Sequence, residues 1–103
     1  MQAPAAIFKS AEIAKGVSAV AREFSPDVVR IRYNADSDWS GDAAVYFRVL
    51  LADEVAEKRL HEVATKVRKR IESKLKLEDR GFLTYTSFRT VTEQAELQEE
   101  CWD

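Results

Sequence analysis

Two stretches of the chain place apolar residues three or four positions apart, which is the spacing of one buried helix face. The first covers residues 7–24, and Pro26 ends it because the residue before a proline avoids helical angles. The second covers residues 52–77, with Asp53 as its expected N-cap and with an acidic start and a basic end that suit the helix dipole. The expected buried positions are Ile13, Val17, Val20, Ala21 and Phe24 in the first helix, and Ala56, Leu60, Val63, Ala64, Val67, Ile71 and Leu75 in the second.

Three other stretches alternate with the period of two that is typical of strands. In residues 28–34, Val29, Ile31 and Tyr33 are expected to face the core, while Val28 and the polar residues between them face away. Residues 43–51 are apolar on nearly both faces, which predicts a central strand with a neighbour on each side. Residues 82–91 form the third predicted strand.

These elements predict an α+β fold of order α-β-β-α-β, a two-layer sandwich in which a three-stranded sheet is packed by two helices. The first two strands are close in sequence, so a hairpin is the simplest pairing. If the first and third strands are parallel, the second helix is the crossover between them. We expect a disordered N-terminus over residues 1–6, a single domain over 7–92 and an acidic C-terminal tail over 93–103. The tail is expected to begin as a short helix over 93–97 and then to run out.

The composition limits the functions that such a domain can serve. The chain has 103 residues and a net charge of −2, so any nucleic-acid or membrane partner needs a local patch of positive charge. A single cysteine fits a reducing compartment and excludes an internal disulfide. No apolar run approaches the roughly 20 residues that a membrane span needs, and the first residues are too weakly apolar for a secretory signal. We expect a cytoplasmic protein.

Residue types that support catalysis are sparse. His61 is the only histidine and lies at the edge of a helix stripe, and Cys101 has no base beside it. The three glycines stand apart, so none forms a phosphate-cradling loop. The turn at Asp36 begins like a calcium loop, but its twelfth position is Phe47 instead of glutamate. We therefore predict no enzyme activity, no catalytic residues, no cofactor and no metal, although cation binding by the turn stays open.

The acidic turn over residues 36–42 is the most distinctive stretch of the chain. Its Asp, Ser and Gly residues can satisfy their own backbone, but Trp39 at its tip either folds back on the core or is offered to a partner. The first functional interpretation is therefore a protein-binding module, in which an acidic tail with an aromatic residue also docks. Its candidate contact residues are Asp36, Asp38, Trp39, Asp42, Tyr46, Arg48, Glu99, Glu100 and Trp102.

The alternative interpretation is RNA binding. The order α-β-β-α-β is that of a type II KH domain, and the topology resembles the KH-like ribosome-binding factor A family, although no Gly-x-x-Gly pair is present. The candidate RNA-binding residues are Arg30, Arg32, Arg48, Lys66, Arg68, Lys69, Arg70 and Lys74. A third interpretation is a homodimer formed through an edge strand.

The segments 38–53, 88–94 and 100–102 together resemble a family of small bacterial proteins. Members carry Asp-Trp-Ser/Thr-Gly-Asp, then an apolar Phe-Arg strand and a helix that starts with Ser/Ala-Asp-Glu. The resemblance implies that the gene has a neighbour encoding a small helical protein similar to HEPN domains. This arrangement is common in toxin–antitoxin pairs, so it implies an antitoxin-like or regulatory half of such a pair.

Overall fold

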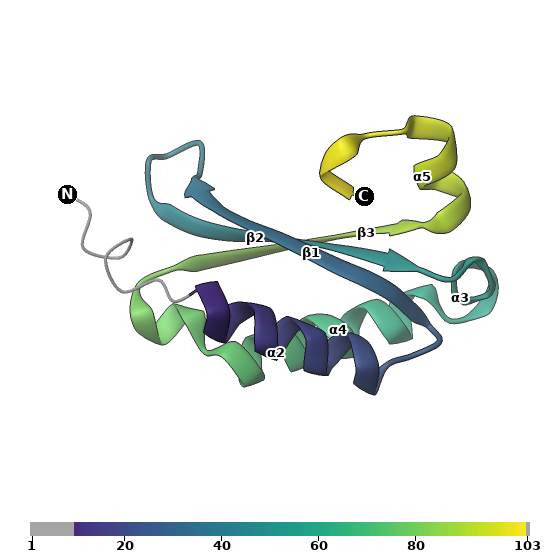
Figure 1. Cartoon of the computed structure of the whole chain (residues 1–103), viewed down its shortest axis with the longest axis horizontal. Helices are drawn as coiled ribbons and strands as arrows, with labels where there is room; N and C mark the ends of the chain where they lie inside the picture. Colours follow the sequence, from purple (N-terminus) through teal and green to yellow (C-terminus); the bar gives the residue numbers. More distant parts are fainter. Residues whose placement is uncertain (1–9, 103) are drawn as a thin grey trace.

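The computed structural model describes residues 10–102, and the prediction for residues 1–6 lies outside this range (Figure 1). Helices α2 and α4 cover one face of a three-stranded sheet, which confirms the predicted two-layer α+β fold of order α-β-β-α-β. The elements are α2 (Ser10–Glu23), β1 (Val28–Ser37), β2 (Ala43–Leu51), α3 (Asp53–Lys58), α4 (Leu60–Leu75), the 3-10 helix η1 (Leu77–Arg80), β3 (Leu83–Thr90), α5 (Val91–Leu97) and the 3-10 helix η2 (Glu100–Trp102).

Strand β2 lies at the centre of the sheet, as its apolarity on both faces predicts. It pairs antiparallel with β1, which confirms the hairpin, and parallel with β3. The chain runs from β2 to its parallel neighbour β3 through α3 and α4, because parallel strands cannot be joined by a tight turn. The third strand therefore pairs with β2 and runs antiparallel to β1, so the first and third strands are not parallel.

The start of β1 departs from the predicted alternation. Val28 is buried, whereas Val29 is 50% exposed, which is the reverse of the expected orientation. The cause is a register shift between Val28 and Arg30, where a bulge adds one residue to β1. The extra residue moves the Val28 side chain to the opposite face of the strand, so that it points into the core. From Ile31 onward the alternation is as predicted.

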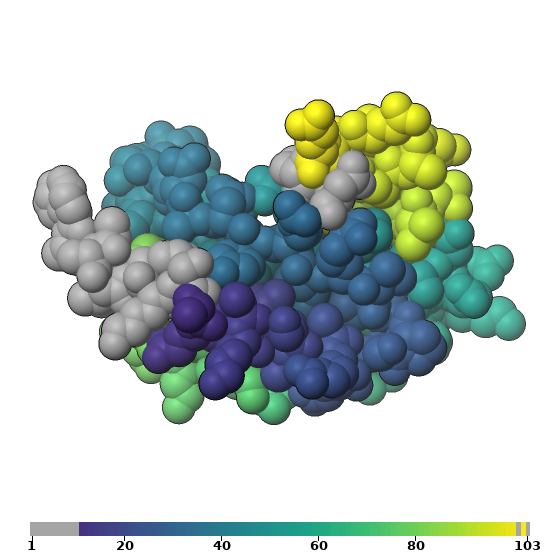
Figure 2. Space-filling model, viewed as in Figure 1, coloured from purple at the N-terminus to yellow at the C-terminus, as the bar shows by residue number. Residues whose placement is uncertain are grey.

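The C-terminal segment, residues 91–102, packs on the face of the sheet that the helices leave open. Figure 2 shows this segment and the hairpin tip rising on either side of that face. The prediction that the chain runs out after Leu97 is wrong, because Trp102 is only 6% exposed. The acidic tail is thus a packed part of the domain up to this residue.

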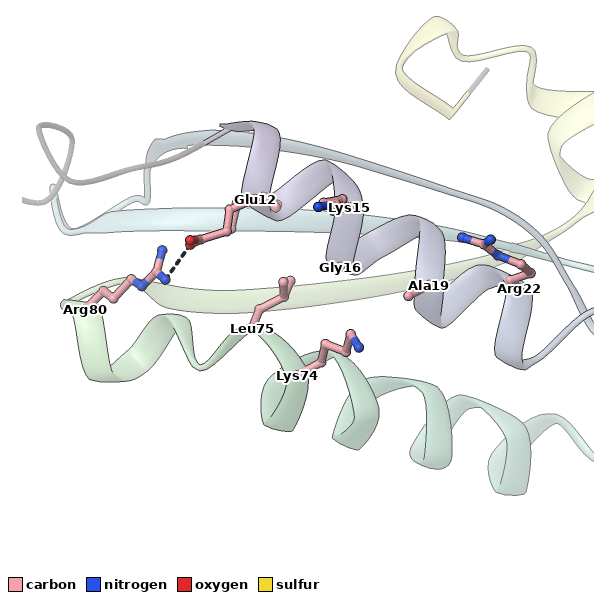
Figure 3. A pocket seen from close by; sticks show the side chains of 9 residues that line it. Glu12, Lys15, Gly16, Ala19, Arg22, Lys74, Leu75 and Arg80 are labelled. Carbon is pink, nitrogen blue, oxygen red and sulfur yellow. Dashed lines mark hydrogen bonds and ion pairs between the residues drawn. The ribbon is translucent and has the colours of Figure 1, made fainter.

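Helices α2 and α4 pack side by side, and Gly16 of α2 faces Leu75 of α4 (Figure 3). A Cβ atom built on Gly16 would lie 2.3 Å from Leu75 Cδ2, far inside van der Waals contact. Gly16 therefore does more than lower the propensity of its helix: its missing side chain lets the two helices approach.

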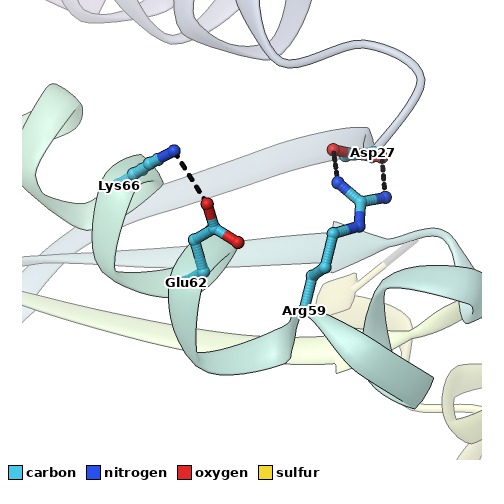
Figure 4. Close-up of polar contacts among 4 residues, drawn as sticks. All are labelled: Asp27, Arg59, Glu62 and Lys66. Carbon is cyan, nitrogen blue, oxygen red and sulfur yellow. Dashed lines mark hydrogen bonds and ion pairs between the residues drawn. The ribbon is translucent and has the colours of Figure 1, made fainter.

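The second predicted helix is broken in two at Arg59, and its N-cap is Ala52 instead of Asp53. Arg59 leaves helical geometry with φ −131°, and its guanidinium donates two hydrogen bonds of 2.9 Å to Asp27 (Figure 4). The Asp53 carboxylate instead accepts hydrogen bonds from Thr92, which fixes the start of α3 independently of α4. As a result Val55 is buried, and Leu60, predicted to be buried, is 44% exposed.

Replacing Gly16 with alanine should destabilise the protein. The helix-propensity gain of about 1 kcal/mol is opposed by overpacking against Leu75, which costs about 1–3 kcal/mol, so we expect a net loss of about 1 kcal/mol. Urea unfolding measures this difference. Ser18→Ala, at an exposed position of the same helix, is the matched control and should change stability little; a Gly16→Ala protein more stable than wild type would contradict the steric account.

Candidate functional site

The hairpin turn between β1 and β2 is organised by the carboxylate of Asp38. Its Oδ1 accepts hydrogen bonds from the Ser40 amide (2.9 Å), the Ser40 hydroxyl (2.7 Å) and the Asp42 amide (3.0 Å). Its Oδ2 accepts from the hydroxyl of Tyr85 on β3, at 3.0 Å. Gly41, at φ +90°, closes the turn by donating its amide to the Asp38 carbonyl. The turn is thus tied both to itself and to the far edge of the sheet.

These hydrogen bonds favour the charged form of Asp38. They hold its pKa below the usual value of 3.8, mainly through the Ser40 hydroxyl; burial opposes this shift, and the Tyr85 hydroxyl and the backbone amides add to it. The hydrogen bond that the Tyr85 hydroxyl donates to Asp38 raises the pKa of Tyr85. A cation in this turn would have to compete with four donors. Residues 10–102 contain no cluster of three His, Cys, Asp or Glu side chains that could hold a metal ion.

Trp39 follows Asp38 and projects from the turn. Its side chain is 90% exposed, so Trp39 does not fold back on the core. Asp36 and Asp42 are also exposed near the tip. The tip therefore presents one large aromatic side chain beside two carboxylates, on a backbone that Asp38 holds in place.

The open face of the sheet continues from this tip. Tyr46 of β2 stacks on Tyr85 of β3, with ring centroids 5.2 Å apart and planes 18° apart. Arg48, two residues further along β2, donates a hydrogen bond to Asn34 of β1. Tyr46 and Arg48 therefore share this face, as the alternation predicts.

The C-terminal segment covers the other end of the open face. Arg89 lies over the Trp102 ring at 4.3 Å from its centroid and forms an ion pair of 2.7 Å with Glu99. Gln94 donates to the Glu99 carbonyl at 2.7 Å, and the segment begins with a capping box formed by Thr90 and Glu93.

Trp102 and Glu99, predicted to contact a partner, are thus engaged within the chain, whereas Glu100 is exposed. The role of Arg89 and Gln94 in holding this segment was not predicted from the sequence. The capping-box pattern of Thr90 and Glu93 is the feature of the sequence that indicates a helix here.

The residues proposed for RNA binding fall into two separate groups. Arg30, Arg32 and Arg48 belong to the open face of the sheet. Lys66, Arg68, Lys69, Arg70 and Lys74 belong to α4, which packs on the opposite face (Figure 1). The sheet lies between the two groups, so they do not form one continuous basic surface.

An apolar groove that the sequence did not predict lies where α4 begins. It has a volume of about 560 Å³ and is lined by apolar side chains that include Leu51, Leu60 and Phe88, with His61 at its polar rim. Leu60, which follows the break at Arg59 and is partly outside the core, forms part of its wall. A groove of this composition can seat an apolar side chain.

Replacing Asp38 with asparagine should lower the urea midpoint at neutral pH. The folded pKa lies below the unfolded one, so the charged carboxylate stabilises the fold above about pH 4, and this contribution is lost as the pH falls through the folded pKa. The difference between wild type and Asp38→Asn should therefore be largest near neutral pH and shrink in acid.

Asp36→Asn is the matched control, since the Asp36 side chain accepts only from the neighbouring Ser37 amide among the hydrogen bonds found for it. This variant should follow the wild-type pH profile. A constant difference between wild type and Asp38→Asn from pH 7 down to pH 2 would show that the charge of Asp38 does not stabilise the turn.

Comparison with known proteins yields no matching family model, no matching curated protein and no matching solved structure. Among residues 10–102, no helix has the length and apolarity that crossing a bilayer requires. The likeness to the small bacterial family stays a prediction.

Proposed function

We propose that this protein is a non-catalytic module that binds a second protein through its hairpin tip, with Trp39 as the main contact residue. The observation that carries the proposal is the 90% exposure of Trp39 on a turn that Asp38 holds in one conformation. An aromatic side chain on a fixed backbone loses little conformational freedom on binding and buries a large area. Tryptophan is also enriched among residues that dominate interface energies.

The surroundings of Trp39 indicate the chemistry of the partner. Asp36 and Asp42 are exposed within three residues of Trp39 in the chain, so a complementary surface would have an apolar pocket with basic residues at its rim. Tyr46 and Arg48 could extend the contact along the open face. Asp38 supports this surface from within, and Trp102 and Glu99 support the open face by packing against Arg89.

The family resemblance suggests which kind of protein this partner is. It implies a small helical neighbour similar to HEPN domains, and we therefore propose that the module is the antitoxin-like or regulatory half of such a pair. This identification rests on the resemblance, whereas the role of Trp39 rests on its exposure.

RNA binding through the sheet face is less well supported, because the arginines there already have partners. Arg30 donates to the Trp102 carbonyl at 3.4 Å, Arg48 donates to Asn34, and Arg32 also interacts within the chain. A phosphate would have to displace these contacts.

Trp39→Ala should abolish recovery of the cognate partner from cells of the source organism, whereas Trp39→Phe should retain a substantial part. The physical reason is that phenylalanine keeps an apolar ring in the partner's pocket. Affinity-purified wild-type, Trp39→Ala and Trp39→Phe proteins are compared by quantitative mass spectrometry. A partner counts only if it is lost with alanine and kept with phenylalanine.

The purified partner is then titrated into a Trp102→Phe protein, in which Trp39 is the only tryptophan. Burial of the indole in the complex should shift its fluorescence to shorter wavelength. Equal recovery of every protein by wild type and Trp39→Ala, or binding without a fluorescence shift, would contradict the proposed role of the tip.

A further inference from the structure

The helical layer carries positive charge although the chain as a whole is acidic. Helices α2 and α4 together hold seven basic residues and four acidic ones, while the whole chain has a net charge of −2. The basic residues are Lys15, Arg22, Lys66, Arg68, Lys69, Arg70 and Lys74, and the acidic residues are Glu12, Glu23, Glu62 and Glu72. The molecule is therefore polarised, with its positive side opposite the open face of the sheet.

Ion pairs neutralise only part of this layer. Glu62 pairs with Lys66 at 3.0 Å (Figure 4), Glu23 pairs with Arg70 at 2.8 Å, and Glu12 pairs with Arg80 of η1. Three of the four acids are thus already matched to a cation. Lys15, Arg22 and Lys74 form no ion pair with any residue in the described range 10–102.

These three unpaired cations line one groove between α2 and α4 (Figure 3). The groove has a volume of about 480 Å³, and Ala19 contributes a small side chain to its wall, whereas Leu75 fills the space beside Gly16. The groove therefore combines positive charge with room for a narrow ligand.

We infer that this groove binds the phosphodiester backbone of single-stranded nucleic acid. Lys15 and Arg22 are seven residues apart on α2, which is about 10 Å of helix, so their charges can meet two different phosphates of one strand. Among residues 10–102, no aromatic side chain lines the groove, so these residues offer no platform on which bases stack, and their contact is to the backbone whatever the sequence.

A phosphodiester backbone suits the groove because it carries one negative charge at every nucleotide, and the three unpaired cations come from separate positions on the two helices that form the groove. This surface is separate from the hairpin tip, so it is independent of the proposed function. Trp39→Ala should leave it unaffected.

The test is fluorescence anisotropy of the full chain with labelled oligouridylate of about 12 nucleotides, a length within the site sizes of single-strand binders. With about three phosphate contacts, the logarithm of the association constant should fall with the logarithm of salt at a slope of about −2. Between about 50 and 200 mM KCl this slope corresponds to a loss of affinity of roughly 16-fold.

The double variant Lys15→Gln/Lys74→Gln should weaken binding by about tenfold at low salt and reduce the slope to about −0.7, since two of about three contacts are removed. The control Lys58→Gln/Lys76→Gln removes the same charge from α3 and from the C-cap of α4, at residues that do not line the groove, and should stay within about twofold of wild type. Circular dichroism confirms that each variant is folded.

Equal binding of oligothymidylate and oligouridylate supports backbone contact, and preference for either one identifies the natural strand. The inference is overturned by any of three results: absent or salt-independent binding, equal weakening in the groove variant and the control, or binding of polyglutamate as tight as that of the oligonucleotides. The last result would assign the groove to an acidic protein. None of these results bears on Trp39.

Discussion

The carboxylate of Asp38 is the interaction on which the exposed tip of this protein depends. It accepts hydrogen bonds from two amides and one hydroxyl of its own turn, and from the hydroxyl of Tyr85 on β3. The turn is consequently fixed to the opposite edge of the sheet across the central strand β2. Trp39 can then stand 90% exposed on a backbone that does not have to be ordered when a partner binds.

The rest of the fold covers one face of β2 and one end of the other. The helices bury one face, and the C-terminal segment folds back so that Trp102 and Arg89 cover one end of the other. Between that segment and the hairpin tip, the stacked pair Tyr46–Tyr85 remains as the open part of the sheet. The protein therefore has a sheet side that carries the tip and a helix side that carries Lys15, Arg22 and Lys74, and we propose a different partner for each side.

Local sequence patterns predicted the helices and strands. The bulge in β1, the helix break at Arg59 and the role of Asp38 depend on contacts between distant residues, so local patterns could not predict them. Apolarity on both faces identified β2 as central, but two consecutive valines gave no sign of which one the bulge at Val29 would expose. A continuous apolar stripe hid the break at Arg59, which depends on Asp27, 32 residues away. Among three similar aspartates, only Asp38 reaches Tyr85, 47 residues away, so its structural role could not be read from the turn.

The presentation of Trp39 depends on Asp38 fixing the conformation of the turn. Amide hydrogen exchange of individual turn residues, followed by NMR, measures this, because the Ser40 and Asp42 amides donate to the Asp38 carboxylate while no acceptor is found for the Trp39 amide within residues 10–102. We expect Ser40 and Asp42 to exchange much more slowly than Trp39, and Asp38→Ala to remove this difference. Exchange of all three amides at one fast rate in the wild-type protein would contradict this role of Asp38.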